Sequence, residues 1–409
     1  MSALTNRTYG RLFIAQVVSL VGTGLATVAL GLLAYDLAGA GSALVLGTVF
    51  AIKMAAYVAV APVAAAVTHA APPRVVMVAA DLVRVVVVLG LPLVSAVWQV
   101  YVLVLAMQAA SAVHTPTYQA VLPRVLRDPR RYTQALSLSR LAEDLEMVLS
   151  PLLAAALLLL VPSSDLFVGT AICFAVSAAL VSRVTLGRAP VEDEPQPFGV
   201  RVRRGVELIV RSPALRAVLA LNLAVAAGGA YVLVQYVLIA REAYGRGDGT
   251  AALLMAALGA GSITVATLLP RALDALPERA VMLGGAGLLT VATAGVATAL
   301  TVPGTGGLVL VGAMFALVGA GWAAAETPVG RIIARTTPER DQPAVFAAQF
   351  SLSHACWLVT YPLAGWLGER GLGSAALVLA AVSAAAVAAT AALWPRRAPR
   401  RPLVADVAG

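Results

Sequence analysis

The pattern of polar and apolar positions is a succession of long apolar runs, separated by short stretches that contain arginine, glycine or proline. A helix needs about 20 apolar residues to cross the hydrocarbon core of a bilayer, and the runs reach this length. They predict an all-α integral membrane protein with twelve transmembrane helices. The expected spans are 11–36, 43–69, 74–95, 99–122, 135–161, 165–186, 213–238, 250–270, 279–301, 306–330, 342–368 and 372–394.

The segments between these runs alternate in charge. One set is rich in arginine and includes 123–134, 183–211 and the tail PRRAPRRP, whereas the other set has little positive charge apart from Arg241, Arg246 and Arg370. Positively charged loops stay on the cytoplasmic side of a membrane. We therefore expect a multi-pass protein of the cytoplasmic (inner) membrane with both termini inside, an inside loop at 123–134 and an outside loop at 239–249. The first apolar run is too long for a signal peptide and is expected to remain as a helix.

Composition agrees with a membrane protein and excludes other classes. The chain is 60% hydrophobic and 12% charged, against about 25% charged residues in soluble domains. Its net charge of +9 is spread over short loops rather than one folded face, so no nucleic-acid partner is expected. Cys173 and Cys356 lie inside apolar runs and are expected to be small buried hydrophobic residues. The sequence contains no spaced metal motif, nucleophile elbow or phosphate-binding loop. We therefore expect that the protein is not an enzyme and binds no cofactor.

A long polar segment divides the chain at its midpoint. We expect an N-terminal six-helix bundle at 1–186, a cytoplasmic linker at 187–212, a C-terminal six-helix bundle at 213–394 and a basic cytoplasmic tail at 395–409. Within the linker, VRVRRGVELIV is compatible with a short amphipathic helix on the membrane surface. A plain linker with flanking basic residues explains it equally well.

Internal similarity supports two repeated halves. RVVMVAADL at 74–82 resembles RAVMLGGAG at 279–287, and HTP at 114–116 resembles ETP at 326–328. SLSRLAEDLEMVLSPLLA at 137–154 resembles SLSHACWLVTYPLAG at 351–365. Pro62 and Pro270 end the second spans of the two halves. Four matches in the same order indicate a duplicated six-helix unit.

This arrangement resembles the major facilitator superfamily over nearly the whole chain. YGRLFIAQVVSLVGTGLATVALGLLAYDL, QAVLPRVL and RGVELIVRSPALRAVL are similar to its drug and siderophore exporters of the macrolide-efflux and enterobactin-exporter type, and the opening also resembles its nickel-resistance exporters. Asp81 and Arg84 match the family's third span. His69 and Ala70 depart from the family's charged pattern between spans two and three. The resemblance implies alternating access around a central site between the halves.

Ionisable residues inside the spans are the candidate functional residues, because each costs about 2.5–3.5 kcal/mol at a helix centre. Lys53 is the only lysine of the chain and lies in the middle of an apolar run. A rise of about 1.5 Å per residue places the candidates in one polar layer in the inner half of the membrane. The residues expected to serve transport and proton coupling are Lys53, Glu143, Glu146, His114, Glu326 and His354.

Several of these residues also have structural interpretations. Asp81 with Arg84, and Arg140 with Asp144, are expected to be structural pairs along one helix. His114 and His354 could each simply hydrogen-bond a neighbouring helix, and the ETP motif could mark a kink at Glu326. A Lys53–Glu146 pair could exchange protons during transport or could be a fixed link between spans two and five.

Together these features predict a monomeric secondary transporter, a proton-coupled exporter of a small molecule such as a drug, siderophore or metabolite. The direction of transport follows from the family resemblance alone. Efflux of a divalent metal such as nickel or cobalt is the alternative, because His114, His354 and the carboxylates are suitable ligands. A non-transporting membrane receptor is the third possibility. The interior is expected to be mainly aliphatic, which disfavours flat, stacked substrates.

Overall fold

The computed structural model describes residues 3–68, 71–126, 128–184, 198–338 and 341–394, and all regular secondary structure within these ranges is helical. The departure from the family pattern at His69 and Ala70 lies outside the described residues. The N-terminal half contains α1 (Arg7–Ala38), α2 (Ser42–Thr68), α3 (Pro73–Gly90), α4 (Val97–Val125), α5 (Pro129–Leu157) and α6 (Asp165–Ser182), with short helical turns at Ala3–Thr5, Gly39–Gly41 and Leu91–Leu93.

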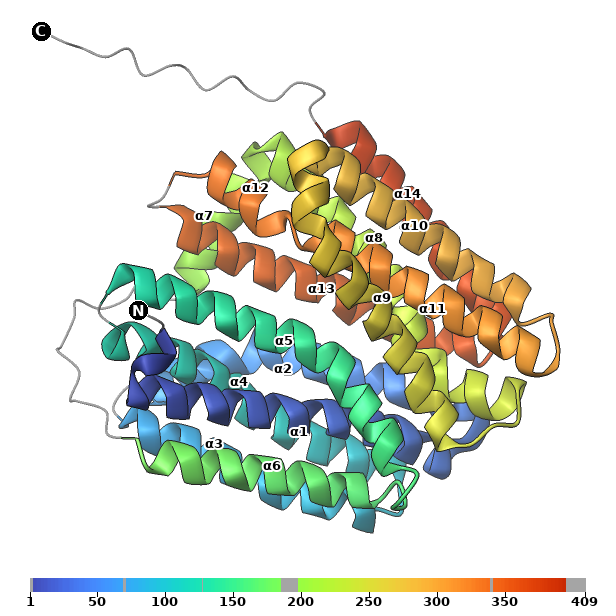
Figure 1. Ribbon diagram of the computed structural model, residues 1–409, viewed down its shortest axis with the longest axis horizontal. Helices are drawn as coiled ribbons and strands as arrows, with labels where there is room; N and C mark the ends of the chain where they lie inside the picture. Colours follow the sequence, from blue (N-terminus) through green and yellow to red (C-terminus); the bar gives the residue numbers. More distant parts are fainter. Residues whose placement is uncertain (1–2, 69–70, 127, 185–197, 339–340, 395–409) are drawn as a thin grey trace, which may run out of the picture.

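The C-terminal half repeats this succession of long helices. It contains α8 (Pro213–Leu238), α9 (Asp248–Ala275), α10 (Glu278–Ala299), α11 (Gly304–Glu326), α13 (Gln342–Gly368) and α14 (Leu372–Leu393), with two shorter helices, α7 (Phe198–Arg211) and α12 (Val329–Thr336), and a π-helical turn at Ile239–Ala243. Figure 1 shows the two bundles side by side, with α1–α6 in one and α8–α14 in the other. The bundles meet where α2 packs along α13 and α5 along α9.

Nine stretches of the described residues are long and apolar enough to cross a membrane, and two of them each run over a long helix and part or all of the next one. The expected all-helical membrane fold is confirmed, whereas the count of twelve spans stays a prediction. The expected ends of span eleven, 342–368, coincide with α13. The connection expected at 123–134 is shorter in the structure, since α4 continues to Val125 and α5 begins at Pro129, and its cytoplasmic side stays a prediction. Polar helical turns that extend beyond an apolar zone leave no trace in hydropathy.

The two proline motifs behave differently. At ETP, α11 ends at Glu326 and α12 begins at Val329, so the chain breaks at the proline as one interpretation expected. At HTP, α4 continues through Pro116 without interruption. The repeated motif therefore has a different backbone conformation in each half.

The segment before the second half is a helix rather than a plain linker. Its charged and apolar residues alternate with a helical period along α7, and α7 packs against α13. Gly205 permits this contact, because a Cβ there would lie 1.9 Å from the carbonyl oxygen of Ala344. Arg204 also lies 3.7 Å from the carboxylate of Asp341. The helix is thus attached to the C-terminal half.

Reciprocal glycines join three helices of the C-terminal half. A Cβ on Gly261 of α9 would lie 1.8 Å from the carbonyl of Ala316 in α11, and a Cβ on Gly319 of α11 would lie 1.8 Å from that of Leu258 in α9. Gly285 of α10 and Gly321 of α11 face each other in the same way. A Cβ on Gly285 would lie 2.8 Å from the Gly321 carbonyl oxygen, and a Cβ on Gly321 would lie 2.5 Å from the Gly285 carbonyl oxygen. Small residues let membrane helices approach until their backbones touch.

The two halves touch at one end of the molecule. We call this end the far end, and the opposite one the arginine-rich end. The segments that connect the helices at the far end are 39–41, 94–96, 158–164, 244–247, 300–303 and 369–371. At the far end the Tyr236 hydroxyl of α8 donates to the Val28 carbonyl of α1, at 3.3 Å. Gly47 of α2 lies against the Tyr361 carbonyl, and Gly365 of α13 against the Ala43 carbonyl. The far end is therefore closed by backbone-to-backbone contact.

Ionic contacts reinforce this closure. Arg241 lies 3.7 Å from Asp36 of α1 and also pairs with Asp248 of α9. Its guanidinium covers the ring of Tyr35 at 4.9 Å, and the Tyr35 hydroxyl donates to Glu242. These contacts join α1 to the π-helical turn after α8 across the boundary between the bundles.

Candidate functional site

The most buried carboxylate of the described residues lies inside the N-terminal bundle. Asp81 is fully buried at the centre of α3, and Arg84, one helical turn later, is 3% exposed. Their side chains form an ion pair along the helix. Both point away from the exposed residues Leu82 and Val83, because side chains three apart share a helix face. Burial of two charges is costly unless they are paired and hydrogen-bonded.

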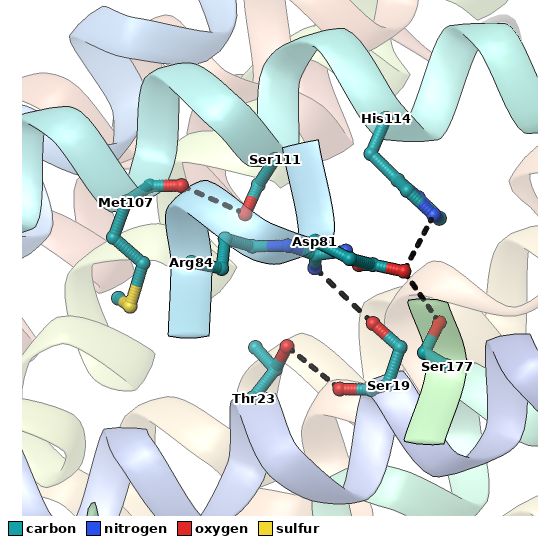
Figure 2. A network of polar contacts seen from close by, with 8 residues as sticks. All are labelled: Ser19, Thr23, Asp81, Arg84, Met107, Ser111, His114 and Ser177. Carbon is teal, nitrogen blue, oxygen red and sulfur yellow. Dashed lines mark hydrogen bonds and ion pairs between the residues drawn. The ribbon is translucent and has the colours of Figure 1, made fainter. Parts of the chain in front are cut away.

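Neighbouring helices provide hydrogen bonds to the Asp81–Arg84 pair, as Figure 2 shows. Ser177 of α6 donates a hydrogen bond to Asp81 Oδ2 at 2.8 Å. Arg84 Nη1 donates to the Ser19 hydroxyl of α1 at 3.1 Å, and its guanidinium lies 4.3 Å from the centre of the Phe174 ring. The pair is therefore held by α1, α3 and α6 together.

His114 of α4 completes the group. Its Nε2 lies 3.7 Å from Asp81 Oδ2, and the residue is 7% exposed. This nitrogen makes no hydrogen bond with the residues that the structure describes. Asp81 thus has a permanent cation on one side and a group that can gain a proton on the other. Figure 2 shows the imidazole and the Ser177 hydroxyl approaching the same carboxylate oxygen.

The charges of this group depend on His114. With a neutral imidazole, Asp81 and Arg84 cancel each other. A proton on His114 would add a positive charge, and Asp81 is the carboxylate that could stabilise it. The carboxylate would then be shared between two cations, which would weaken its hold on Arg84. The arrangement can therefore couple binding of one proton to a change in contacts among α1, α3, α4 and α6.

Lys53 and His354 lie on α2 and α13, which pack against each other at the junction of the halves. Lys53 is half-buried on α2, and its charge acts on the imidazole of His354 on α13. His354 donates from Nδ1 to the carbonyl oxygen of Phe350 at 2.7 Å and stacks against the Phe350 ring. The sequence pattern did not suggest this neighbourhood, because it joined Lys53 to Glu146.

Glu146 lies at the contact of α5 with α1. Its Oε1 lies 2.6 Å from the place where a Cβ on Gly24 would stand, and Ser150 lies closer still. The side chains of Arg140, Glu143 and Asp144 lie outside the described part of the chain. The Lys53–Glu146 pair and the Arg140–Asp144 pair therefore stay predictions.

Glu326 lies within a group of aromatic rings. Trp322 Nε1 donates to its Oε2 at 2.9 Å. The Trp322 ring lies 5.0 Å from that of Trp357, which lies 5.0 Å from that of Tyr361. The expectation of a mainly aliphatic interior is wrong at this junction. Composition gives the number of aromatic residues but not where the fold gathers them.

The predicted residues that the structure describes thus have different neighbours, and their common depth in the membrane stays a prediction. His114 faces Asp81, whereas His354 contacts Phe350 and is influenced by the charge of Lys53. Among the described residues, no group of three or more His, Cys, Asp or Glu side chains could hold a metal ion. The two histidines on which the metal hypothesis rested therefore have separate surroundings.

Sequence reasoning missed three partners of the buried pair, namely Ser19, Ser177 and Phe174. Serine and phenylalanine are frequent in membrane helices, so neither stands out in an apolar run. The signal that could have found them is positional: each must face α3 at the depth of Asp81.

An all-helical fold of two bundles with buried ionisable groups defines a multi-pass membrane protein. A sequence profile described as Major Facilitator Superfamily matches residues 12–359, and the chain belongs to this superfamily. It is therefore a secondary transporter. No curated protein sequence matches the chain.

Solved structures with the same fold are transporters with low sequence identity. The nucleoside transporter NupG (D323A mutant) superimposes with a TM-score of 0.74 at 11% identity, covering 95% of this chain and 100% of that one. A POT family transporter in complex with 5-aminolevulinic acid gives 0.74 at 11%, covering 95% and 96%. A bacterial homologue of the human lysosomal transporter Spinster, in an inward-facing and unoccupied conformation, gives 0.68 at 13%, covering 95% of both chains.

Proposed function

We propose that this protein is a proton-coupled exporter of a small molecule in the cytoplasmic membrane, with its arginine-rich end in the cytoplasm. The observation that carries the proposal is the contact of His114 with the buried Asp81–Arg84 pair. A titratable group placed against a buried ion pair changes the charge balance of the bundle when it gains one proton. Such groups in membrane helices mark proton and substrate pathways.

Alternating access links this proton to movement. Protonated His114 and Arg84 compete for Asp81, so each protonation state favours a different packing of α3 and α4 against α1 and α6. A proton shifts the equilibrium between two conformations only by its difference in affinity for them. The closed far end supports a state that receives substrate from the cytoplasm. Export rather than uptake rests on the similarity to drug and siderophore exporters.

Lys53 and His354 form the second proposed coupling group. They lie on α2 and α13, the helices that join the halves, so movement of one half changes their separation. Glu143, Glu146 and Glu326 remain proposed partners in transport. A nickel or cobalt cargo is less supported, because His114 and His354 do not share a site.

His114→Gln is expected to abolish gradient-driven export and to leave substrate exchange intact. Glutamine keeps a polar group beside Asp81 but carries no titratable proton. We would express the protein in a bacterial strain without its own drug exporters and identify a substrate from a panel of labelled compounds and metal ions. Export and exchange of that substrate are then compared in inverted vesicles with an imposed proton gradient.

Ser111→Ala is the matched control. Ser111 lies one turn from His114 on α4 and donates only to the Met107 carbonyl of its own helix, at 3.0 Å. This variant should export at the wild-type rate. Gradient-driven export by His114→Gln at that rate would contradict the coupling role.

Orientation is tested separately by labelling of single cysteines. Asp128→Cys and Gly247→Cys, each in a background without Cys173 and Cys356, place one thiol in an exposed position at each end. In intact cells an impermeant maleimide should label only the second variant, because position 128 is expected to face the cytoplasm. Labelling of both from outside would contradict the orientation.

A further inference from the structure

Aromatic side chains line one face of α13. Phe346, Phe350, His354, Trp357 and Tyr361 follow one another at intervals of three or four residues, which places them on the same side of a helix. Exposure falls along this row, from 44% and 47% at Phe346 and Phe350 to 8% and 6% at Trp357 and Tyr361. The row thus begins exposed near the arginine-rich end and becomes buried toward the closed far end.

Rings from two other helices meet the buried part of the row. Trp322 of α11 lies 5.0 Å from Trp357, and Phe50 of α2 lies 4.9 Å from Tyr361, measured between ring centres. All these contacts are tilted, with interplanar angles of 32–35°. Phe50 belongs to the N-terminal half and the other rings to the C-terminal half. We call Phe50, Trp322, Glu326, Trp357 and Tyr361 the aromatic site.

A glycine of α8 makes room for the two indole rings. A Cβ on Gly229 would lie 2.4 Å from an atom of Trp357 and 3.0 Å from one of Trp322. The rings therefore lie directly against the backbone of α8. The Trp322 ring, tilted by 32° against Trp357, is held in place in this way and is suited to a flat partner, because stacked or tilted rings gain most from overlap of their faces.

Glu326 supplies negative charge to this surface. It accepts the hydrogen bond of Trp322 Nε1, and its charge also acts on Tyr361 and Cys356. Glu326 and Trp322 are only half-buried. Faces of aromatic rings attract cations through the ring quadrupole, most strongly for tryptophan. Rings and carboxylate therefore favour the same kind of ligand.

We propose that the aromatic site binds a flat organic cation, which stacks on the half-buried Trp322 ring and pairs its charge with Glu326. This inference rests on the proposed transport function and names the substrate class. Ordinary core packing would explain the rings alone. It does not explain a half-buried carboxylate beside two tryptophans, at the junction where the halves must separate.

The position of the site also gives a route for release. Because Phe50 lies on α2 and its partners on α11 and α13, opening of the far end would pull Phe50 away from Tyr361. The ligand would then lose one wall of the site as it gains access to the far side. Binding and conformational change are coupled when a ligand contacts both moving parts.

The test is equilibrium binding of ethidium, a flat permanent cation, to the purified protein in detergent without a proton gradient. Fluorescence anisotropy gives its Kd for the wild type and for Glu326→Gln and Trp322→Leu. Each substitution should raise the Kd about tenfold, as expected for loss of a partly buried cation–π or charge contact. Fluorescein, a flat anion, should bind at least about tenfold more weakly than ethidium to the wild type.

Trp366→Leu is the matched control. Trp366 is another tryptophan of α13, but it is 46% exposed and covers the Arg370 guanidinium at 3.4 Å. This variant should keep the wild-type Kd. All variants should elute as single symmetrical peaks in size-exclusion chromatography, and Glu326→Gln preserves the shape of the side chain in any case.

Three results would overturn the inference: absence of ethidium binding to the wild type, equal binding of fluorescein, or equal weakening by Trp366→Leu. None of them affects the test of His114, which uses whichever compound of the panel is exported. Conversely, ethidium binding that depends on Glu326 and Trp322 supports the site even if His114→Gln exports normally.

Discussion

Replacing Asp81 by alanine is expected to lower the free energy of unfolding by about 3–5 kcal/mol, the usual cost of removing one partner from a buried ion pair. The substitution would leave the Arg84 guanidinium, 3% exposed, without its carboxylate. Ser177 would also lose its acceptor. Unfolding of the purified protein by increasing SDS in mixed micelles, followed by circular dichroism, measures the change.

Two controls distinguish a lost ion pair from general damage. Asp274→Ala removes an exposed aspartate from α9 and should change stability by less than about 0.5 kcal/mol. Asp81→Leu combined with Arg84→Met should recover most of the loss, because apolar replacement of a whole buried pair is often neutral or stabilising. If Asp81→Ala unfolds like the wild type, the pair contributes little to stability.

The second large effect is expected from Gly47→Val. A Cβ at this position would lie 2.5 Å from the Tyr361 carbonyl oxygen and 3.2 Å from the Gly365 Cα. Both are backbone atoms of α13 that cannot rotate away, so α2 and α13 must move apart at the far end. The protein should then favour the state that is open at the far end, with export reduced by more than about tenfold, a shift of about 1.4 kcal/mol or more.

Labelling reports this shift directly. Ser42→Cys places a nearly isosteric thiol at a buried position at the far-end start of α2, 3% exposed. An impermeant maleimide should label it faster in the Gly47→Val background. Gly287→Val is the matched control, since a Cβ there meets nothing within 4 Å. Unchanged labelling in the Gly47→Val background would mean that this glycine does not set the closure.

The fold could be predicted from the sequence because the bilayer imposes its thickness on every apolar run. The ends of α8 and α13 lie where proline, glycine and charge place them, at Pro213–Leu238 and Gln342–Gly368. The start of α5 could not be found in this way. Its first turns carry arginines outside the apolar zone, and a helix there depends on Pro129 and hydrogen bonds rather than on hydropathy.

The candidate site was only partly visible for a different reason. A single buried charge such as Asp81, Lys53 or His114 is conspicuous in an apolar run. Which charges meet depends on rotation and depth of each helix, and an error of one residue turns a side chain by about 100°. The sequence therefore paired Lys53 with Glu146, which stays a prediction, and gave no sign that the charge of Lys53 would act on His354. Trp322 and Trp357, far apart in the chain, gave no sign that they would meet.

The reciprocal glycine contacts of α9, α10 and α11 have a mechanical consequence. Backbones in direct contact can neither slide nor rotate without collision, so these helices form a stiff block. The N-terminal half instead has buried charges at its centre, whose hydrogen bonds can be exchanged at little steric cost. The two halves thus differ in how easily they deform. Under the proposed mechanism, the first half would deform when it takes up a proton, and the second would transmit that deformation as a rigid body.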